Sequence, residues 1–171
     1  MKLINQEDKI FVAGSTGMVG SSIIRNLNKK GYKNILSNDK SSLNLLNYNA
    51  VEKWFEIQKP DVVIIAAAKV GGIFANSNYP ADFLLENIKI QSNLIEISYK
   101  KNAKRLLFLG SSCIYPKYAN QPISEEELMT APLEKTNEAY AIAKIAGIKL
   151  VESFRKQYGF DCISLMPTNL Y

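Results

Sequence analysis

The 171-residue sequence contains no histidine and only two cysteines, and this scarcity excludes several kinds of site. Cys113 and Cys162 lie far apart, and neither belongs to a metal-ligand spacing. We therefore predict no metal site and no disulfide framework. The absence of histidine matters again for the catalytic residues considered below.

Long apolar segments are missing as well. The longest strongly apolar run, residues 62–68, is far shorter than the roughly 20 residues that a membrane-spanning helix needs. Residues 1–9 lack the apolar core of a signal peptide. These features predict a cytoplasmic protein with no membrane partner.

The charge is positive but not concentrated. The net charge is +5 and the pI is near 9.1, yet the only close group of basic residues is Lys100, Lys101, Lys104 and Arg105. A solvated face explains such a group better than a nucleic-acid site does. A mild positive charge also suits an anionic dinucleotide or a nucleotide-diphosphate sugar. We predict no nucleic-acid partner.

What the sequence does contain is an alternation of short apolar runs with longer amphipathic stretches. With 47% hydrophobic and 22% charged residues, the chain can bury the core of one globular domain. The alternation predicts βαβ units and a Rossmann-type α/β fold, a doubly wound parallel sheet with helices on both faces. Residues 1–8 are an N-terminal extension, and residues 9–171 form the domain.

The individual elements follow from apolar spacing and from capping residues. Asn47 is expected to cap a helix that ends before Pro60, and Gly31 and Gly159 are expected to close two others. Residues 115–132 form a loop with one helical turn. Strands are predicted at 9–13, 34–37, 61–68, 106–109 and 162–166, with a further short one near 43–46, and helices from 19 to Gly31, at 81–100 and at 138–158.

A glycine-rich turn joins the first strand to the first helix. Gly14, Gly17 and Gly20 provide a tight turn, a close backbone approach and a free helix N-terminus, which together suit a pyrophosphate. Glycine turns between a strand and a helix are common, so the spacing alone is weak evidence. In this context it predicts dinucleotide binding, and its G-x-x-G-x-x-G form resembles the extended short-chain dehydrogenase/reductases.

Tyr140 and Lys144 stand one helical turn apart in the predicted helix 138–158. A lysine cation beside a tyrosine favours the phenolate and lowers the pKa of the phenol, which could then deliver its proton to a carbonyl oxygen. The bare pattern is often a surface pair. Its place after a glycine turn and several strands favours a catalytic interpretation.

The segment Gly110-Ser-Ser-Cys-Ile-Tyr-Pro116 follows the predicted strand 106–109, where ligands of open α/β sheets bind. Ser111 could hydrogen-bond a substrate carbonyl, or it could simply end the strand. Cys113 could exchange protons at carbons next to a ketone, or it could be an inert core residue. Cys162, within a strand, is interpreted as core.

Six segments together resemble the successive motifs of the GDP-L-fucose synthases. The match runs from about residue 9 to the last residue, and Ser-Ser-Cys-Ile-Tyr-Pro with Ala-Ala-Lys-Val-Gly-Gly is more specific than the superfamily signatures. The segments are Gly14-Ser-Thr-Gly-Met-Val-Gly20, Ala66-Ala-Ala-Lys-Val-Gly-Gly72, Tyr79-Pro-Ala-Asp-Phe83, Leu109-Gly-Ser-Ser-Cys-Ile-Tyr-Pro116, Tyr140-Ala-Ile-Ala-Lys-Ile-Ala-Gly147 and Pro167-Thr-Asn-Leu-Tyr171.

The resemblance implies an NADP(H)-dependent enzyme that epimerises GDP-4-keto-6-deoxy-D-mannose at C3 and C5 and reduces its C4 ketone, giving GDP-L-fucose. It implies that Tyr140 donates a proton, Lys144 orients the nicotinamide ribose, Ser111 holds the keto group and Cys113 is one epimerisation acid/base. It also implies a homodimer. The implied cofactor-binding residues are Gly14, Ser15, Thr16, Gly17, Met18, Val19, Gly20, Leu109, Gly110, Ser111, Ser112, Lys144, Pro167, Thr168, Asn169 and Leu170.

Two departures from the family pattern limit the transfer. The family uses a histidine downstream of Pro-Thr-Asn-Leu-Tyr, and its substrate lobe is largely C-terminal, so this chain has the appearance of a fragment that is inactive alone. Some members hold the 2′-phosphate of NADP with basic residues. Here Asp39 could accept ribose hydroxyls, as in NAD enzymes, whereas Lys40 would favour a phosphate, and both could equally lie in a solvated turn.

The open alternatives are of two kinds. Other extended short-chain enzymes, the nucleotide-sugar 4,6-dehydratases and 4-epimerases, share the glycine turn and the Tyr140 and Lys144 pair but have no need of Cys113. A non-catalytic dinucleotide-binding module is the alternative from a different class, although such a module need not keep Ser111, Tyr140 and Lys144 together.

Overall fold

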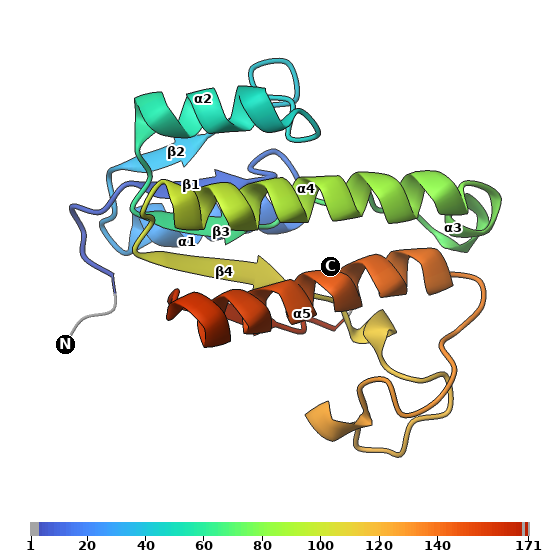
Figure 1. The fold of residues 1–171 in the computed structure, drawn as a ribbon. Helices are drawn as coiled ribbons and strands as arrows, with labels where there is room; N and C mark the ends of the chain where they lie inside the picture. Colours follow the sequence, from blue (N-terminus) through green and yellow to red (C-terminus); the bar gives the residue numbers. More distant parts are fainter. Residues whose placement is uncertain (1–3, 169, 171) are drawn as a thin grey trace.

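A parallel sheet forms the centre of the computed structural model, which describes residues 4–168 and residue 170 (Figure 1). The sheet has five strands in the order β2-β1-β3-β4-β5, and every neighbouring pair is parallel. This confirms the predicted doubly wound α/β fold. The strands are β1 (Ile10–Ala13), β2 (Ile35–Ser37), β3 (Val62–Ile65), β4 (Arg105–Leu109) and β5 (Cys162–Leu165).

The predicted helices are present, and their ends have the expected causes. The Asn47 side chain accepts a hydrogen bond from the Ala50 backbone N–H at the start of α2. Gly159 closes α5 with a φ of 67°, in the left-handed region that glycine tolerates. The helices are α1 (Met18–Lys29), α2 (Tyr48–Gln58), α3 (Ile73–Asn78), α4 (Pro80–Lys100) and α5 (Glu138–Tyr158), and short 3-10 turns occur at Ser112–Ile114 and Glu125–Glu127.

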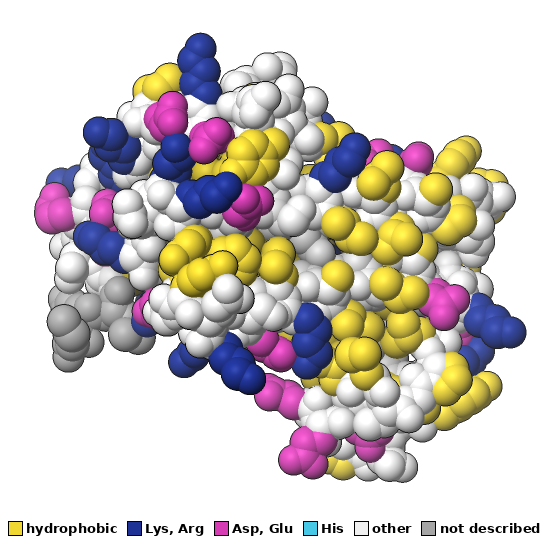
Figure 2. Space-filling view, viewed as in Figure 1, with side chains coloured by type: hydrophobic (Ala, Val, Ile, Leu, Met, Phe, Trp, Pro, Cys, Tyr) yellow, Lys and Arg dark blue, Asp and Glu magenta, His cyan; other side chains and the backbone are white. Residues whose placement is uncertain are grey.

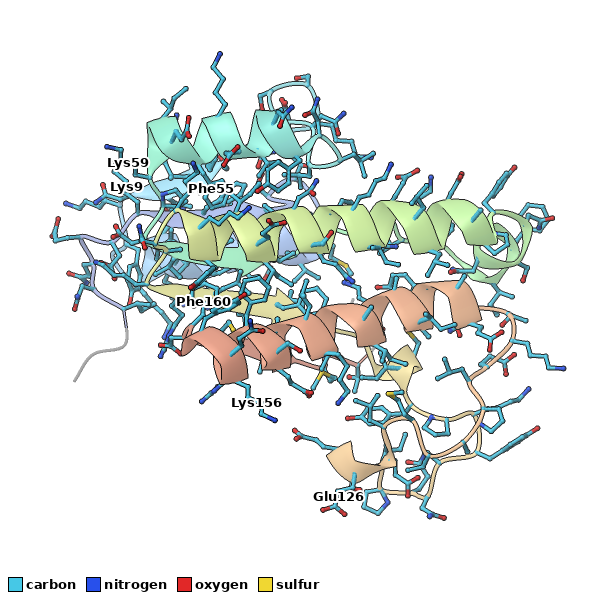
Figure 3. The ribbon with its side chains drawn as sticks, in the orientation of Figure 1. Lys9, Phe55, Lys59, Glu126, Lys156 and Phe160 are labelled. Atoms are coloured by element: carbon cyan, nitrogen blue, oxygen red, sulfur yellow. The ribbon has the colours of Figure 1, made fainter. Side chains whose placement is uncertain are left out.

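Apolar side chains cover both faces of the sheet. On one face Phe11 and Phe108 belong to a cluster that includes residues of α2, α4 and α5, and Figure 3 shows Phe55 and Phe160 within this layer. On the other face Ile10 packs in a cluster with Leu27 of α1. Since successive strand residues point to opposite faces, a continuous apolar run fills both layers.

The short strand predicted near residues 43–46 is wrong. The backbone donors there serve local turns, because the Leu43 N–H bonds to the Asp39 carbonyl and the Leu46 N–H to the Asn44 side chain. Leu43 is nevertheless buried and belongs to the main core cluster. Its apolar character therefore reflects packing of a loop and not strand pairing.

The order of the strands creates the setting for a site. From β1 the chain moves to β2 on one side and later returns to β3 on the other side of β1. The loops after β1 and β3 therefore diverge at the carboxyl ends of the strands, where open α/β sheets bind ligands. Over the residues that the structure describes, no helix combines the length and apolarity needed to cross a membrane.

Candidate active site

A cavity of about 890 Å³ lies at the carboxyl ends of the strands. It is lined by the loops that follow all five strands, by the N-terminal parts of α1 and α5, and by Glu86 and Ile90 of α4. Most residues predicted from the sequence line it: Gly14, Thr16, Gly17, Met18, Val19, Gly20, Leu109, Gly110, Ser111, Tyr140, Lys144, Pro167, Thr168 and Leu170. Ser15, Ser112 and Cys113 do not line it, and Asn169 lies outside the described residues.

The three glycines of the turn have different reasons to be glycine. A Cβ on Gly14 would lie 2.7 Å from the Ala67 nitrogen, and one on Gly20 would lie 2.1 Å from the Gly14 carbonyl oxygen, so the fold itself excludes side chains there. A Cβ on Gly17 would meet only the Gly14 oxygen, at an ordinary 3.4 Å. Gly17 is the N-cap of α1 and has no side chain to cap it, and the first residues of that helix, Met18 to Gly20, line the cavity.

The Ser15 side chain makes a structural hydrogen bond. Its side chain is only 7% exposed and its hydroxyl donates to the Asn38 carbonyl at 2.8 Å. This bond ties the glycine turn to the end of β2, which brings Asn38, Asp39 and Lys40 to the cavity wall. Binding of a cofactor by Ser15 stays a prediction.

The Asp39 carboxylate is occupied by its own turn. One of its oxygens accepts from the Ser41 hydroxyl and from the Ser42 backbone N–H, each at 2.7 Å. These hydrogen bonds lower the pKa of Asp39 to about 2. The neighbouring Lys40 is exposed and lines the cavity. Asp39 also lines the cavity, so the end of β2 presents one acidic and one basic side chain to it.

Lys144 is buried, with 4% exposure, on the inner face of α5. Its ammonium donates to the Leu109 carbonyl at the end of β4, 2.8 Å away, and lies 4.8 Å from the centre of the Phe108 ring. Burial lowers the pKa of Lys144 to about 8, opposed by the nearby Cys113. The cation is thus held at the cavity floor by a fixed backbone partner.

The prediction that Lys144 lowers the pKa of Tyr140 is wrong for this structure. Burial is the largest influence on the phenol and, with the neighbouring Cys113, raises the pKa of Tyr140 to about 12. The ammonium lies 5.8 Å from the centre of the tyrosine ring and turns toward Leu109. At neutral pH Tyr140 is therefore a protonated phenol, the state that a proton donor requires.

Ser111 and Cys113 complete the group. A hydrogen bond with the Ser111 hydroxyl lowers the pKa of Tyr140 and of Cys113, against the effect of burial, which raises both. The Ser111 hydroxyl therefore lies beside both side chains. Burial nevertheless raises the pKa of the half-buried Cys113 thiol, which lies close enough to Lys144 to feel its charge. The fold thus gathers the four predicted catalytic residues from two segments of the chain.

Cys162 is part of the core, as predicted. Its side chain is fully buried, and the thiol contacts the carbonyls of Val151 and Phe160, each at 3.3 Å. The two cysteines of the chain therefore have different settings. Only Cys113 lies near the group formed by Ser111 and Lys144.

Comparison with known proteins identifies the family. Residues 10–171 match the NAD dependent epimerase/dehydratase family. The chain belongs to this family. Within it, the chain is 58% identical over 163 residues to a GDP-L-fucose synthase of Sinorhizobium fredii, covering 95% of this chain and 52% of that protein.

Two solved structures share the fold closely. One is a GDP-mannoheptose C4 reductase from Campylobacter jejuni with NADP bound, with a TM-score of 0.95, 39% identity and coverage of 98% of this chain and 53% of that one. The other is a GDP-L-fucose synthetase from Naegleria fowleri bound to NADP, with a TM-score of 0.87, 31% identity and coverage of 98% and 56%. The chain spans about half the length of the curated relatives it matches.

Sequence reasoning missed part of the cavity wall of this family member. The loop after β3 contributes residues 66–71, and the turn at 43–46 contributes four more. Lys69 in this loop pairs with Glu86 of α4 at 2.6 Å, and Glu86 also lines the cavity. The signal for the first loop was available, because it follows a buried parallel strand and carries a family motif.

Proposed function

We propose that this chain is the dinucleotide-binding half of a GDP-L-fucose synthase, which converts GDP-4-keto-6-deoxy-D-mannose to GDP-L-fucose with NADPH. The observation that carries the proposal is that one continuous cavity runs from the glycine turn to Ser111, Tyr140 and Lys144. Cys113 lies beside these three residues. Relatives that act on GDP-linked sugars support the class of substrate.

The residues at one end of the cavity fit a dinucleotide. The free N-terminus of α1 suits a pyrophosphate, and Gly17 leaves room that no protein atom occupies. Lys40, which is exposed on the cavity wall, would face a 2′-phosphate, and one oxygen of the Asp39 carboxylate is engaged within its turn. Lys144 would hold the nicotinamide ribose. When bound, NADPH supplies the hydride that reduces the C4 ketone.

The other end fits the proton transfer of that reduction. Ser111 would donate a hydrogen bond to the C4 oxygen, and Tyr140 would give that oxygen its proton. The raised pKa of Tyr140 keeps the proton in place until negative charge develops on the substrate oxygen. The Lys144 ammonium lies 5.8 Å from the centre of the ring and is held on the Leu109 carbonyl.

Cys113 fits the preceding epimerisation as one of its two acid/base groups. Burial raises the pKa of its thiol, so it carries a proton at neutral pH and can deliver it to the deprotonated carbon next to the ketone. Removal of the original proton needs a base on the opposite side of the sugar. The resemblance to the family assigns the other half of this acid/base pair to a histidine, a residue type that the 171-residue sequence does not contain.

The proposal includes a homodimer in the cytoplasm. The outer surfaces of α4 and α5 carry hydrophobic side chains (Figure 2), among them Leu85, Ile142 and Tyr158, which are 54%, 44% and 48% exposed. A second copy could cover them. Because both the dinucleotide and the GDP-sugar are multiply charged and do not cross a bilayer unaided, we place the enzyme where these nucleotides are made.

Two measurements test the proposal. The 171-residue chain should bind NADPH, detected by the change in nicotinamide fluorescence, but should not turn over GDP-4-keto-6-deoxy-D-mannose. A chimera that joins residues 1–168 to the second half of the Sinorhizobium fredii relative should form GDP-L-fucose. Binding without turnover by a folded chimera would favour a non-catalytic dinucleotide-binding module instead. A chain that does not bind NADPH at all would contradict the proposal.

A further inference from the structure

Gln91 is a buried polar residue in the middle of α4, with 3% exposure. Its side-chain nitrogen donates to the Ala143 carbonyl of α5 at 2.6 Å, across 52 residues of sequence. A buried amide without a partner is costly, so such a pair is expected to be satisfied. The position of its partner is the informative feature, because Ala143 lies between Tyr140 and Lys144 in the same helical turn.

The bond reaches α5 from outside that helix. Within an α-helix the Ala143 carbonyl already accepts from the N–H four residues later, that of Gly147. The Gln91 amide is therefore a second donor to one carbonyl. It does not complete the helix, and its effect is to fix the turn containing Tyr140 and Lys144 relative to α4.

Gly147 allows the close approach on which this contact depends. A Cβ at this position would lie 2.5 Å from Phe108 Cζ and 2.8 Å from both Cδ and Oε1 of Gln91. Glycine inside a helix lowers stability by about 1 kcal/mol relative to alanine, so its presence here has a packing reason. The same Phe108 ring lies 4.8 Å from the Lys144 ammonium. The depth of α5 against β4 and the position of Lys144 are thus set together.

We propose that Gln91 is a positioning residue for Lys144 and Tyr140, acting through the Ala143 carbonyl, with Gly147 providing the space for this contact. The proposal rests on the proposed function for its role in the reaction. The geometric part stands by itself: Gln91 holds the α5 turn at the depth where the Lys144 ammonium meets the Leu109 carbonyl.

The test is Gln91→Met in the 171-residue chain, which removes the donor at similar volume and leaves the Ala143 carbonyl with its helical partner. The pKa of Lys144 is measured by NMR titration with ¹³Cε-labelled lysine, and Lys144→Met identifies its resonance. A looser turn admits water to the ammonium, so the pKa should rise from about 8 toward its ordinary value. We expect the acid dissociation constant of the Lys144 ammonium to change by about threefold or more. The dissociation constant of NADPH should rise by about fivefold.

Ser98→Ala is the matched control, because Ser98 is also buried in α4 and its hydroxyl donates to the Leu94 carbonyl of the same helix. This variant should lower the melting temperature but leave the pKa of Lys144 and the NADPH dissociation constant unchanged. Gly147→Ala should change the pKa of Lys144 and the NADPH dissociation constant in the same direction as Gln91→Met. If Gln91→Met does not fold, Gly147→Ala serves as the test in its place.

An unchanged Lys144 titration in the folded variant would overturn the proposal and leave Gln91 as a simple tie between two helices. The Lys144 titration uses no cofactor, so it tests the geometric part even if the wild-type chain fails to bind NADPH. If the wild-type chain does not bind NADPH, the proposed function is contradicted, but the proposed contact between Gln91 and α5 is not. A shifted pKa with unchanged NADPH affinity would also overturn the functional part, since the reacting groups would have moved without consequence.

Discussion

The Lys144 ammonium and the Leu109 carbonyl are 2.8 Å apart, so the cation of the site is already anchored by the protein itself. The carbonyl ends β4 and the ammonium comes from α5, two elements separated by residues 110–137. A backbone oxygen cannot swing away as a side chain can. Lys144 is therefore held in a fixed position by the backbone, at the expense of keeping a charge in a buried place.

That buried charge predicts a pH dependence of stability. The folded-state pKa of Lys144 is about 8, below its ordinary 10.5, so the unfolded chain binds the proton more tightly. The loss of stability caused by the buried ammonium is fully present below pH 8 and disappears as the pH rises toward 10.5. Relative to Lys144→Met, the wild-type free energy of unfolding should increase by up to about 3 kcal/mol over this interval. Urea unfolding of both chains measures it, and parallel pH profiles would contradict the prediction.

Gly17→Val should weaken NADPH binding by about tenfold or more while the chain stays folded. The branched side chain fits against the protein but fills the space in front of the α1 N-terminus. The matched control is Gly20→Ala, where the added carbon lies 2.1 Å from the Gly14 oxygen and should lower the melting temperature strongly. Fluorescence titration and thermal unfolding separate the two effects. Unchanged affinity in Gly17→Val would exclude the phosphate site.

Lys40→Ala should reduce affinity for NADPH by about tenfold and leave the affinity for NADH nearly unchanged, because only NADPH carries the 2′-phosphate. Asp39→Ala is a different change, since it removes the acceptor of Ser41 and Ser42 and disturbs the turn. It should weaken both cofactors alike. Tighter binding of NADH than of NADPH by the wild-type chain would show that Asp39 outweighs Lys40.

The parts of the fold that sequence reasoning predicted are those with strong local causes. The run at Val62–Ile65 is apolar throughout because both faces of the sheet are covered, and Asn47 and Gly159 mark helix ends through local hydrogen bonding and backbone conformation. The segment at 43–46 failed because an apolar residue packed from a loop looks like a strand residue. Leu43 is buried without any strand partner.

The proximity of the candidate catalytic residues was predictable from the sequence, but their electrostatics were not. Motif and strand order placed Ser111, Tyr140 and Lys144 together, since the carboxyl ends of parallel strands share one edge. Their pKa values depend on burial and on where the Lys144 ammonium points, which three-dimensional packing decides. The same holds for Ser15, whose hydroxyl has a partner 23 residues away in the sequence.

Tyr140→Phe, made in the chimera with the Sinorhizobium fredii relative, should lower hydride transfer by roughly 10²-fold or more, the scale of a lost general acid. The ring is retained, so its edge contact with Phe83 at 6.4 Å is preserved and the fold should not change. Loss of nicotinamide absorbance reports reduction. Deuterium uptake at C3 and C5 from heavy water should continue, because epimerisation does not use the phenol. Loss of both readings together would contradict separate roles.

Cys113→Ser in the same chimera should have the opposite effect. A hydroxyl keeps the shape, but its pKa lies far above that of the thiol, so proton delivery to carbon should fall by roughly 10²-fold or more. Deuterium uptake at C3 and C5 should then fail, while Tyr140 and Lys144 could still support reduction and yield an unepimerised 6-deoxy sugar. Cys162→Ser provides the control, because it changes the other cysteine of the chain, whose thiol is fully buried in the core and contacts the Val151 carbonyl. If Cys113→Ser takes up deuterium at the wild-type rate, Cys113 has no part in epimerisation and only fills space beside Ser111.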